Sequence, residues 1–250
     1  MNKIMLKKDD VHCGNLLLVN ADHPLKNNTI EKLISVDTQF PDILMEDNAA
    51  KYLQLVLQKI SSGNAIIPVS GYRSEEEQTS IYTNSLKENG EEYTKKYVAL
   101  PNCSEHQTGL AIDLAKNKSD IDFICPDFPY EGICEDFRNN APNYGFIQRY
   151  AENKEKITGI SHEPWHFRYV GFPHSKIITE NDFSLEEYME FIKNFSFENR
   201  FVFNCGNGRK IEIFYIKLDC DKAEILLPEN SIYQISGNNF DGVIVTVWRH

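Results

Sequence analysis

Apolar positions recur at helical spacing in the first third of the chain. Between residues 49 and 60 they fall every three or four residues, at Ala49, Leu53, Val56, Leu57 and Ile60. This spacing places them on one face of a helix. Asp47 or Asn48 can cap the start of that helix, and Gly63 suits its end.

Two capping boxes predict further helix starts. Ser74 is followed by Glu77, and Ser184 by Glu187, so that each serine and glutamate reciprocally satisfy free backbone N–H groups. We expect the first helix to end near Gly90. The second should bury apolar residues that include Phe191 and Phe195. Arg73 therefore lies at the start of a helix, where its side chain can project into a cleft.

Short apolar runs between turn residues predict β-strands. Residues 66–69 form a buried strand, and Pro68 places that strand near a sheet edge because proline cannot donate to the ladder. Further strands are expected at residues 109–115, 144–150 and 164–170. Residues 1–45 show no clear period and are expected to be irregular.

The pattern changes after Phe197. Short β-rich runs at residues 210–218, 224–227, 231–235 and 243–248 alternate with Asn, Gly and Asp turns. We therefore expect a boundary near residue 196, with a main domain of residues 1–195 and a small β-rich subdomain of residues 196–250. The pattern leaves open whether the subdomain is a dimer contact, a wall of a cleft or a stabilising flap.

Composition narrows the class of protein. With 250 residues, 41% of them hydrophobic, the chain can bury an ordinary core. Its formal net charge of −11 argues against a nucleic-acid partner, because phosphate binding depends on Lys and Arg. The first residues lack an apolar signal segment and residues 16–19 are too short to cross a bilayer. We expect a cytoplasmic protein without a membrane partner, with reduced cysteines, and either monomeric or homodimeric.

Two separate segments contain the residue types of a zinc site. Residues 104–113 read Ser-Glu-His-Gln-Thr-Gly-Leu-Ala-Ile-Asp, and residues 163–166 read Glu-Pro-Trp-His. Gly109 allows a turn, so that His106 and Asp113 can face one point. With His166 they make three protein ligands, the number typical of a catalytic zinc with an open position for water.

One carboxylate is left over beside these ligands. Glu163 precedes His166 by three residues and can stand near the metal without binding it. A metal-activated water needs such a group as its general base. This combination points to a zinc hydrolase.

Each of these residues also has an ordinary interpretation. A lone histidine is more often a surface or core residue, and we give that interpretation to His12, His23, His162, His174 and His250. Cys103 and His106 could imitate half of a structural zinc site, although no matching cysteine pair occurs elsewhere. Arg73 would ordinarily be a surface cation.

The ordered motifs resemble those of the D-Ala-D-Ala zinc metallopeptidases, whose fold is shared with the zinc domain of hedgehog proteins. The segments at residues 70–74, 77–78, 144–146, 158–161 and 163–171 are similar to the cytoplasmic VanXY type of vancomycin-resistance D,D-peptidase. The likeness covers essentially the whole chain. It implies an α+β fold with a mainly antiparallel central sheet flanked by helices, and a small C-terminal β appendix.

The resemblance also implies roles for the site residues. Zn²⁺ would be held by His106, Asp113 and His166, with Glu163 as the catalytic base. Arg73 would hold the scissile carbonyl oxygen as it becomes an oxyanion, and a fixed guanidinium there stabilises the transition state more than the ground state. The implied substrate-binding residues are Ser104, Gln78, Ser70 and Trp165, with Ser104 on the terminal carboxylate.

Ser70 departs from some bifunctional relatives, which carry an acidic residue there that suits the free amine of a dipeptide. The division between free D-Ala-D-Ala and the UDP-linked muramyl pentapeptide is therefore open. We expect a D,D-peptidase that acts on either small-molecule substrate. The alternatives are a housekeeping peptidoglycan endopeptidase or L,D-peptidase of the same fold, and a zinc-stabilised binding module without catalysis. A structural zinc site would need neither Glu163 nor Arg73.

Overall fold

The computed structural model describes residues 1–26, 30, 32–206 and 208–249. Tertiary contacts divide the chain into two compact units. Of the described residues, the first unit, here called the central unit, contains residues 19–25, 30 and 32–184. The second, here called the terminal unit, contains residues 1–18, 26, 185–206 and 208–249. Each is described by itself.

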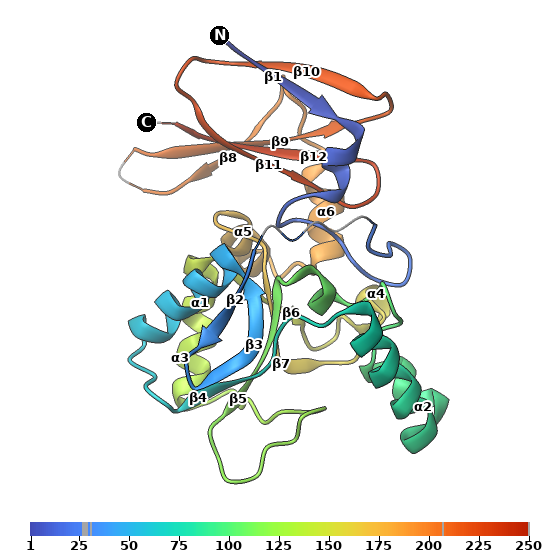
Figure 1. Ribbon diagram of the computed structural model, residues 1–250. Helices are drawn as coiled ribbons and strands as arrows, with labels where there is room; N and C mark the ends of the chain where they lie inside the picture. The colour runs from blue at the N-terminus through green and yellow to red at the C-terminus, as the bar shows by residue number, and fades with distance from the viewer. Residues whose placement is uncertain (27–29, 31, 207, 250) are drawn as a thin grey trace. The chain divides into compact units, whose positions relative to one another are not determined.

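The central unit is built on a four-stranded antiparallel sheet in the order β4-β5-β7-β6 (Figure 1). The strands are β4 (Ile66–Ser70), β5 (Ala111–Lys116), β6 (Phe146–Tyr150) and β7 (Glu163–Tyr169). β2 (Leu33–Asp37) and β3 (Phe40–Glu46) form a separate hairpin. The predicted edge strand around Pro68 is confirmed, since β4 lies at one end of the sheet.

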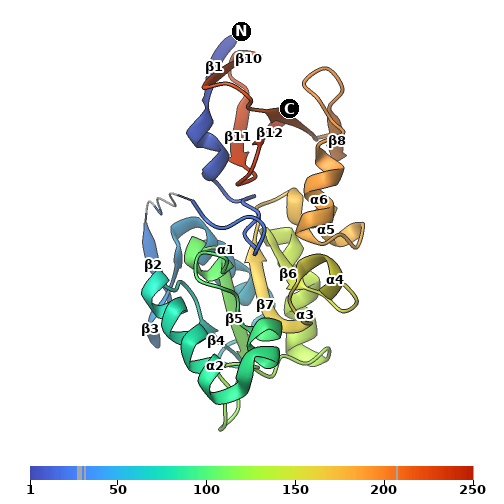
Figure 2. The same cartoon turned by 90° about the vertical axis from the view of Figure 1, so that its right-hand side faces the viewer.

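Strand alternation separates a core face of this sheet from a polar face. Ile112 and Leu114 of β5, together with Phe167 of β7, join a buried apolar cluster with α1 (Asp47–Lys59) and α3 (Gly132–Asn140). Asp113 stands between the two β5 core residues and points to the opposite face. In Figures 1 and 2, α1 and α3 lie on one side of the sheet and α2 (Glu75–Tyr97) lies on the other.

Shorter elements connect these layers. The 3₁₀ helices of the central unit are η2 (Glu105–Thr108) and η3 (Ala141–Tyr144), and its short α-helices are α4 (Glu155–Thr158) and α5 (His174–Glu180). η2 ends at Gly109, whose φ of 71° is in the left-handed region that glycine adopts without strain. The chain turns there from η2 toward β5.

The terminal unit combines both ends of the chain. β1 (Asn2–Lys7) pairs antiparallel with β10 (Lys222–Leu227), and η1 (Lys8–His12) follows β1. A second sheet has the order β11 (Ile232–Gly237), β12 (Gly242–Arg249), β9 (Lys210–Lys217) and β8 (Phe201–Asn204). Helix α6 (Leu185–Ile192) belongs to the same unit, and its apolar core includes Leu6, Phe214 and Val245.

Most of the helices and strands predicted from the sequence agree with those of the structure. The α+β class with an antiparallel central sheet is confirmed, as are α1, the capping box of Ser74 and Glu77, and the strands from residue 210 onward. α2 continues beyond the expected end, to Tyr97, with a kink at Gly90. No helix in the described part of the chain is long and apolar enough to cross a membrane.

The expectation of an irregular stretch at residues 1–45 is wrong. It contains β1, β2 and most of β3. β1 is missed because its buried positions, Ile4 and Leu6, are few and its partner strand lies more than 200 residues away. The boundary near residue 196 stays a prediction, and His250 lies outside the described residues.

Candidate metal centre and active site

The first zinc motif is held in place by the loop before α2. The carbonyl oxygen of Gly71 lies 2.6 Å from His106 Nδ1. Because a carbonyl can only accept, Nδ1 of His106 carries the proton and Nε2 is left with a free lone pair. Gly71 has room for this approach only without a side chain, since a Cβ there would overlap the carbonyl oxygen of Leu44.

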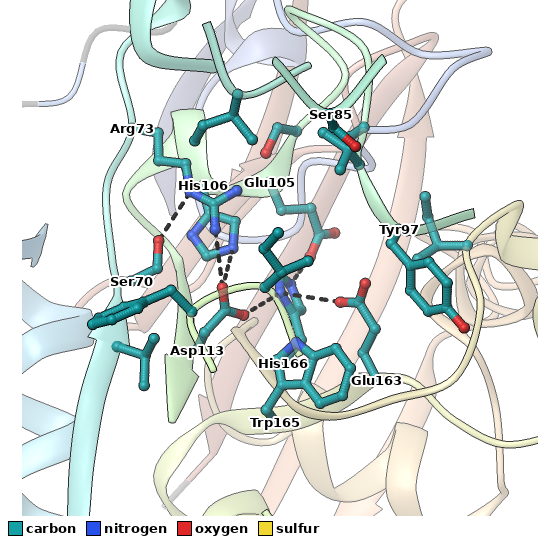
Figure 3. Close-up of a pocket in the computed structure, with 18 of the residues that line it drawn as sticks. Ser70, Arg73, Ser85, Tyr97, Glu105, His106, Asp113, Glu163, Trp165 and His166 are labelled. Atoms are coloured by element: carbon teal, nitrogen blue, oxygen red, sulfur yellow. Dashed lines mark hydrogen bonds and ion pairs between the residues drawn. The ribbon is translucent and has the colours of Figure 1, made fainter. Parts of the chain in front are cut away.

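The second motif reaches the same point through strand pairing. Asp113 on β5 and His166 on β7 are direct cross-strand partners. His166 Nδ1 lies 2.9 Å from Asp113 Oδ1, and His106 Nε2 lies 3.2 Å from Asp113 Oδ2. Figure 3 shows the two imidazoles converging on this carboxylate.

The geometry of these three side chains fits a tetrahedral metal ion. Their ligand atoms lie within 4.8 Å of one another, and all three residues are buried. Two zinc–ligand bonds of about 2.0–2.1 Å at a tetrahedral angle separate the ligand atoms by about 3.3 Å. In the part of the chain that the structure describes, this is the one group of three His, Cys, Asp or Glu residues so arranged.

The electrostatics of the group favour a bound cation. Burial alone would raise the pKa of the Asp113 carboxyl. The charges and hydrogen bonds of His106 and His166 have a larger, opposite effect and hold that pKa well below its usual range. Burial lowers the pKa of His166, while its hydrogen bonds to Asp113 and Glu105 raise it to about 9. A histidine binds a metal ion through a deprotonated nitrogen, so metal binding at this group is expected to release a proton.

Glu163 is the carboxylate beside the ligand group. Its Oε2 lies 3.8 Å from His166 Nδ1, and the side chain is buried. Burial raises the pKa of Glu163 to about 8, with the negative charge of Asp113 adding to the effect. A divalent cation nearby would lower this pKa again. Glu163 can thus exchange a proton near neutral pH.

Arg73 approaches the centre from the loop between β4 and α2. Its Nη2 donates to Asp113 Oδ2 at 3.0 Å, and its Nε donates to Ser70 Oγ at 2.9 Å. Nη1 donates to Gln78 Oε1 at 3.4 Å, while Gln78 Nε2 donates to the carbonyl oxygen of Ala99 at 2.8 Å. The guanidinium is therefore held on three sides.

A cavity of about 430 Å³ opens onto these groups. The ligands, Glu163 and Arg73 line it, as do Ser70, Ser104 and Trp165. α2 contributes Ile81, Asn84 and Ser85 to the wall. Gln78 is fully buried, with both ends of its amide occupied by Arg73 and Ala99. The structure thus brings together eight of the nine expected site residues around the cavity and places Gln78 behind Arg73.

Three charged residues at the centre were not anticipated from the sequence. Glu105 precedes His106, lines the cavity and is fully buried against Arg149 and Arg168. A signal was available, because each arginine occurs in a strand with several large apolar residues: Arg149 follows Phe146 and Ile147, and Arg168 lies between Phe167 and Tyr169. Charged residues are rarely buried unless they are paired.

Comparison with known proteins finds similar chains. A family model described as D-alanyl-D-alanine carboxypeptidase, VanY, matches residues 42–172. The bifunctional D-Ala-D-Ala dipeptidase and carboxypeptidase VanXYC of Enterococcus gallinarum is 46% identical over 71% of this chain and 94% of its own length. The crystal structure of the vancomycin-resistance D,D-dipeptidase VanXYg, in complex with a D-Ala-D-Ala phosphinate analog, is 62% identical, with a TM-score of 0.97 over 99% of both chains.

A mutant of the VanB-type D,D-pentapeptidase VanY, solved in complex with Zn(II), is more distant. It is 28% identical and has a TM-score of 0.59 over 70% of this chain and 98% of its own. The resemblance expected from the motifs is thereby confirmed.

Proposed function

The chain belongs to the VanY family of D-alanyl-D-alanine carboxypeptidases, and from that premise we propose that it is a zinc-dependent D,D-peptidase. Its substrates are the D-Ala-D-Ala dipeptide, precursors of peptidoglycan that end in D-Ala-D-Ala, or both. Hydrolysis of either lowers the supply of the D-Ala-D-Ala terminus, and the activity therefore contributes to vancomycin resistance. Its cytoplasmic location stays a prediction.

His106, Asp113 and His166 would hold the zinc ion through Nε2, a carboxylate oxygen and Nδ1. When bound, the ion supplies Lewis acidity, which polarises a carbonyl and provides a nucleophile from water near neutral pH. Glu163 takes the proton of the attacking water. It then returns that proton to the departing amine of D-Ala.

Arg73 stabilises the charge that develops on the carbonyl oxygen. Its hydrogen bonds to Asp113, Ser70 and Gln78 hold the guanidinium beside the cavity, where it would meet the carbonyl oxygen of the substrate. Gln78 thus contributes to substrate binding through Arg73. Ser104 and Trp165 line the cavity directly, with Ser104 placed to bind the terminal carboxylate.

One observation carries the assignment of catalysis. Glu163 is a buried carboxylate beside the metal ligands, outside the group of three, with a pKa raised to about 8 by burial. A metal site that only stabilises the fold gains nothing from such a group, because an extra buried carboxylate costs free energy. A general base requires it.

The proposal is tested by release of D-Ala from free D-Ala-D-Ala and from the UDP-linked muramyl pentapeptide, and by release of D-Ser from a precursor that ends in D-Ala-D-Ser. The zinc-loaded protein should release D-Ala from at least one D-Ala-D-Ala substrate. Glu163→Ala should bind zinc and release none. Full turnover by zinc-loaded Glu163→Ala would remove Glu163 from the mechanism, and no release by the zinc-loaded wild type would refute the peptidase assignment.

A further inference from the structure

Glu105, Arg149 and Arg168 form a cluster of three buried charges in the central unit. Glu105 Oε1 accepts from Arg149 Nε and from Arg168 Nη1, each at 2.8 Å. All three side chains have 0% exposure. The arginines belong to the neighbouring strands β6 and β7, whereas Glu105 begins η2. The cluster therefore ties η2 to the sheet.

Stability alone is a weak reason for such a cluster. Removing ions from water is costly, and an apolar cluster of similar volume often packs with equal or greater stability. The position of the cluster suggests another reason. Glu105 immediately precedes the ligand His106, and its second oxygen faces the ligand His166.

That contact selects one ring nitrogen of His166 for the metal. Glu105 Oε2 lies 3.4 Å from His166 Nε2, while His166 Nδ1 faces Asp113. A carboxylate can only accept, so the proton stays on Nε2 and Nδ1 is the nitrogen left for the ion. For His106 the Gly71 carbonyl oxygen accepts from Nδ1, which leaves Nε2 of that ring for the ion. Ligand histidines are commonly oriented in this way by a partner on the second nitrogen.

The two arginines explain why Glu105 orients a ligand without becoming one. They hold Oε1 from the sheet side, which prevents the carboxylate from turning toward the ion. Glu105 also offsets part of their positive charge, which would otherwise repel a bound cation.

We propose that Glu105, held by Arg149 and Arg168, is a positioning residue that fixes His166 with Nδ1 toward the metal and so sets the affinity for zinc. This inference rests on the zinc site of the proposed function. Glu105 does not touch the substrate in this role. It acts on the reaction only through His166.

Two substitutions separate the contact from the charge. Glu105→Gln keeps the size of the side chain and removes its charge, while Glu105→Asp keeps the charge and shortens the reach to His166 by one methylene. Glu212→Gln is the matched control, because Glu212 also accepts from two arginines, Arg200 at 2.7 Å and Arg249 at 2.8 Å, and it does not line the cavity.

Zinc affinity is measured by competition with a chromophoric chelator, and far-UV circular dichroism of the metal-free proteins shows which variants fold. We expect both Glu105 variants to bind zinc about 10- to 100-fold more weakly, and Glu212→Gln to bind it as the wild type does. A folded Glu105→Gln or Glu105→Asp protein that binds zinc within twofold of the wild type would overturn the proposal.

A measurement on the wild type decides the matter even if the variants do not fold. Long-range ¹H–¹⁵N NMR of the zinc-loaded protein should show His166 protonated at Nε2 and coordinated through Nδ1. Coordination through Nε2 would overturn the inference. These results are independent of turnover, so a protein that binds zinc as expected but releases no D-Ala would refute the peptidase proposal and leave the role of Glu105 intact.

Discussion

Asp113 is the residue on which the site converges. Its Oδ1 faces His166, and its Oδ2 is shared by His106 and Arg73. One carboxylate thus contacts two of the proposed zinc ligands and the guanidinium proposed to act on the substrate. We therefore expect substitutions around Asp113 to affect zinc binding and turnover differently.

Arg73→Ala should lower kcat by about 100- to 1000-fold, the usual cost of losing a donor to an oxyanion. We expect KM to change little, because the guanidinium acts mainly on charge that develops in the transition state. Steady-state kinetics on D-Ala-D-Ala would show this. Arg73→Lys keeps the charge but loses the planar guanidinium held by Ser70 and Gln78. Its kcat should therefore lie between those of the wild type and Arg73→Ala. A change in KM alone would indicate ground-state binding instead.

His174 should make the protein sensitive to acid. It is buried on α5, and burial lowers its pKa to about 3. The folded protein therefore keeps His174 neutral while the unfolded chain binds a proton below about pH 6.5. Stability falls with pH through this window, and at pH 5 the loss attributable to His174 is about 2 kcal/mol.

Urea unfolding at pH 7.5 and pH 5, in the presence of a chelator, measures this effect. His174→Gln has no titrating group, so its loss of stability between the two pH values should be smaller by about 2 kcal/mol. Equal losses in both proteins would show that His174 does not contribute. Because each protein is compared with itself at the two pH values, any effect of the substitution that does not depend on pH cancels.

At the scale of elements, two irregularities in strand pairing shape the site. The register shifts between Pro68 and Ser70 on β4, and again where β6 residues Gln148 and Tyr150 face Phe167 and Glu163 of β7. Strict alternation would place Glu163 on the core face with Phe167. The extra residues on β7 instead allow Glu163 to face the cavity beside His166, a frequent use of bulges near active sites.

The start of α2 has a separate stabilising device beside Arg73. Ser74 Oγ accepts the Glu77 N–H at 3.1 Å, and Glu77 Oε2 accepts the Ser74 N–H at 2.7 Å. Ser74→Ala should lower the free energy of unfolding by about 1 kcal/mol, measured by urea denaturation. Ser74→Thr retains the hydroxyl and should lose less. No loss in Ser74→Ala would show that the capping box does not stabilise α2.

At the scale of the whole molecule, every expected site residue belongs to the central unit. VanXYC is matched over 94% of its length by 71% of this chain. A relative with both named activities therefore lacks a counterpart to much of the remaining sequence. The family model also matches residues 42–172, which lie in the central unit, and we therefore predict that this unit is sufficient for chemistry.

We expect a chain of residues 19–184 to fold and bind zinc. A chain of residues 1–184 should be less soluble, because β1 loses its partner β10 and exposes Ile4 and Leu6. Circular dichroism and zinc stoichiometry of the two proteins test this. An unfolded 19–184 chain would show that the central unit depends on the terminal one.

The sequence by itself determined the features that depend on neighbouring residues. The spacing from Ala49 to Ile60 indicated α1, Ser74 and Glu77 marked the start of α2, and Gly109 allowed the turn between His106 and Asp113. The ordered motifs identified the family. These signals are local because helix periodicity, capping and a positive φ each involve only a few consecutive residues.

Only the tertiary structure decided the features that join distant segments. The pairing of β1 with β10, the register shift between β6 and β7 near Glu163, and the hydrogen bond of Gln78 to the Ala99 carbonyl oxygen all depend on such contacts. So does the cluster of Glu105 with Arg149 and Arg168. A buried charge is stable only beside its partner, and which residues become partners is settled when the strands pair.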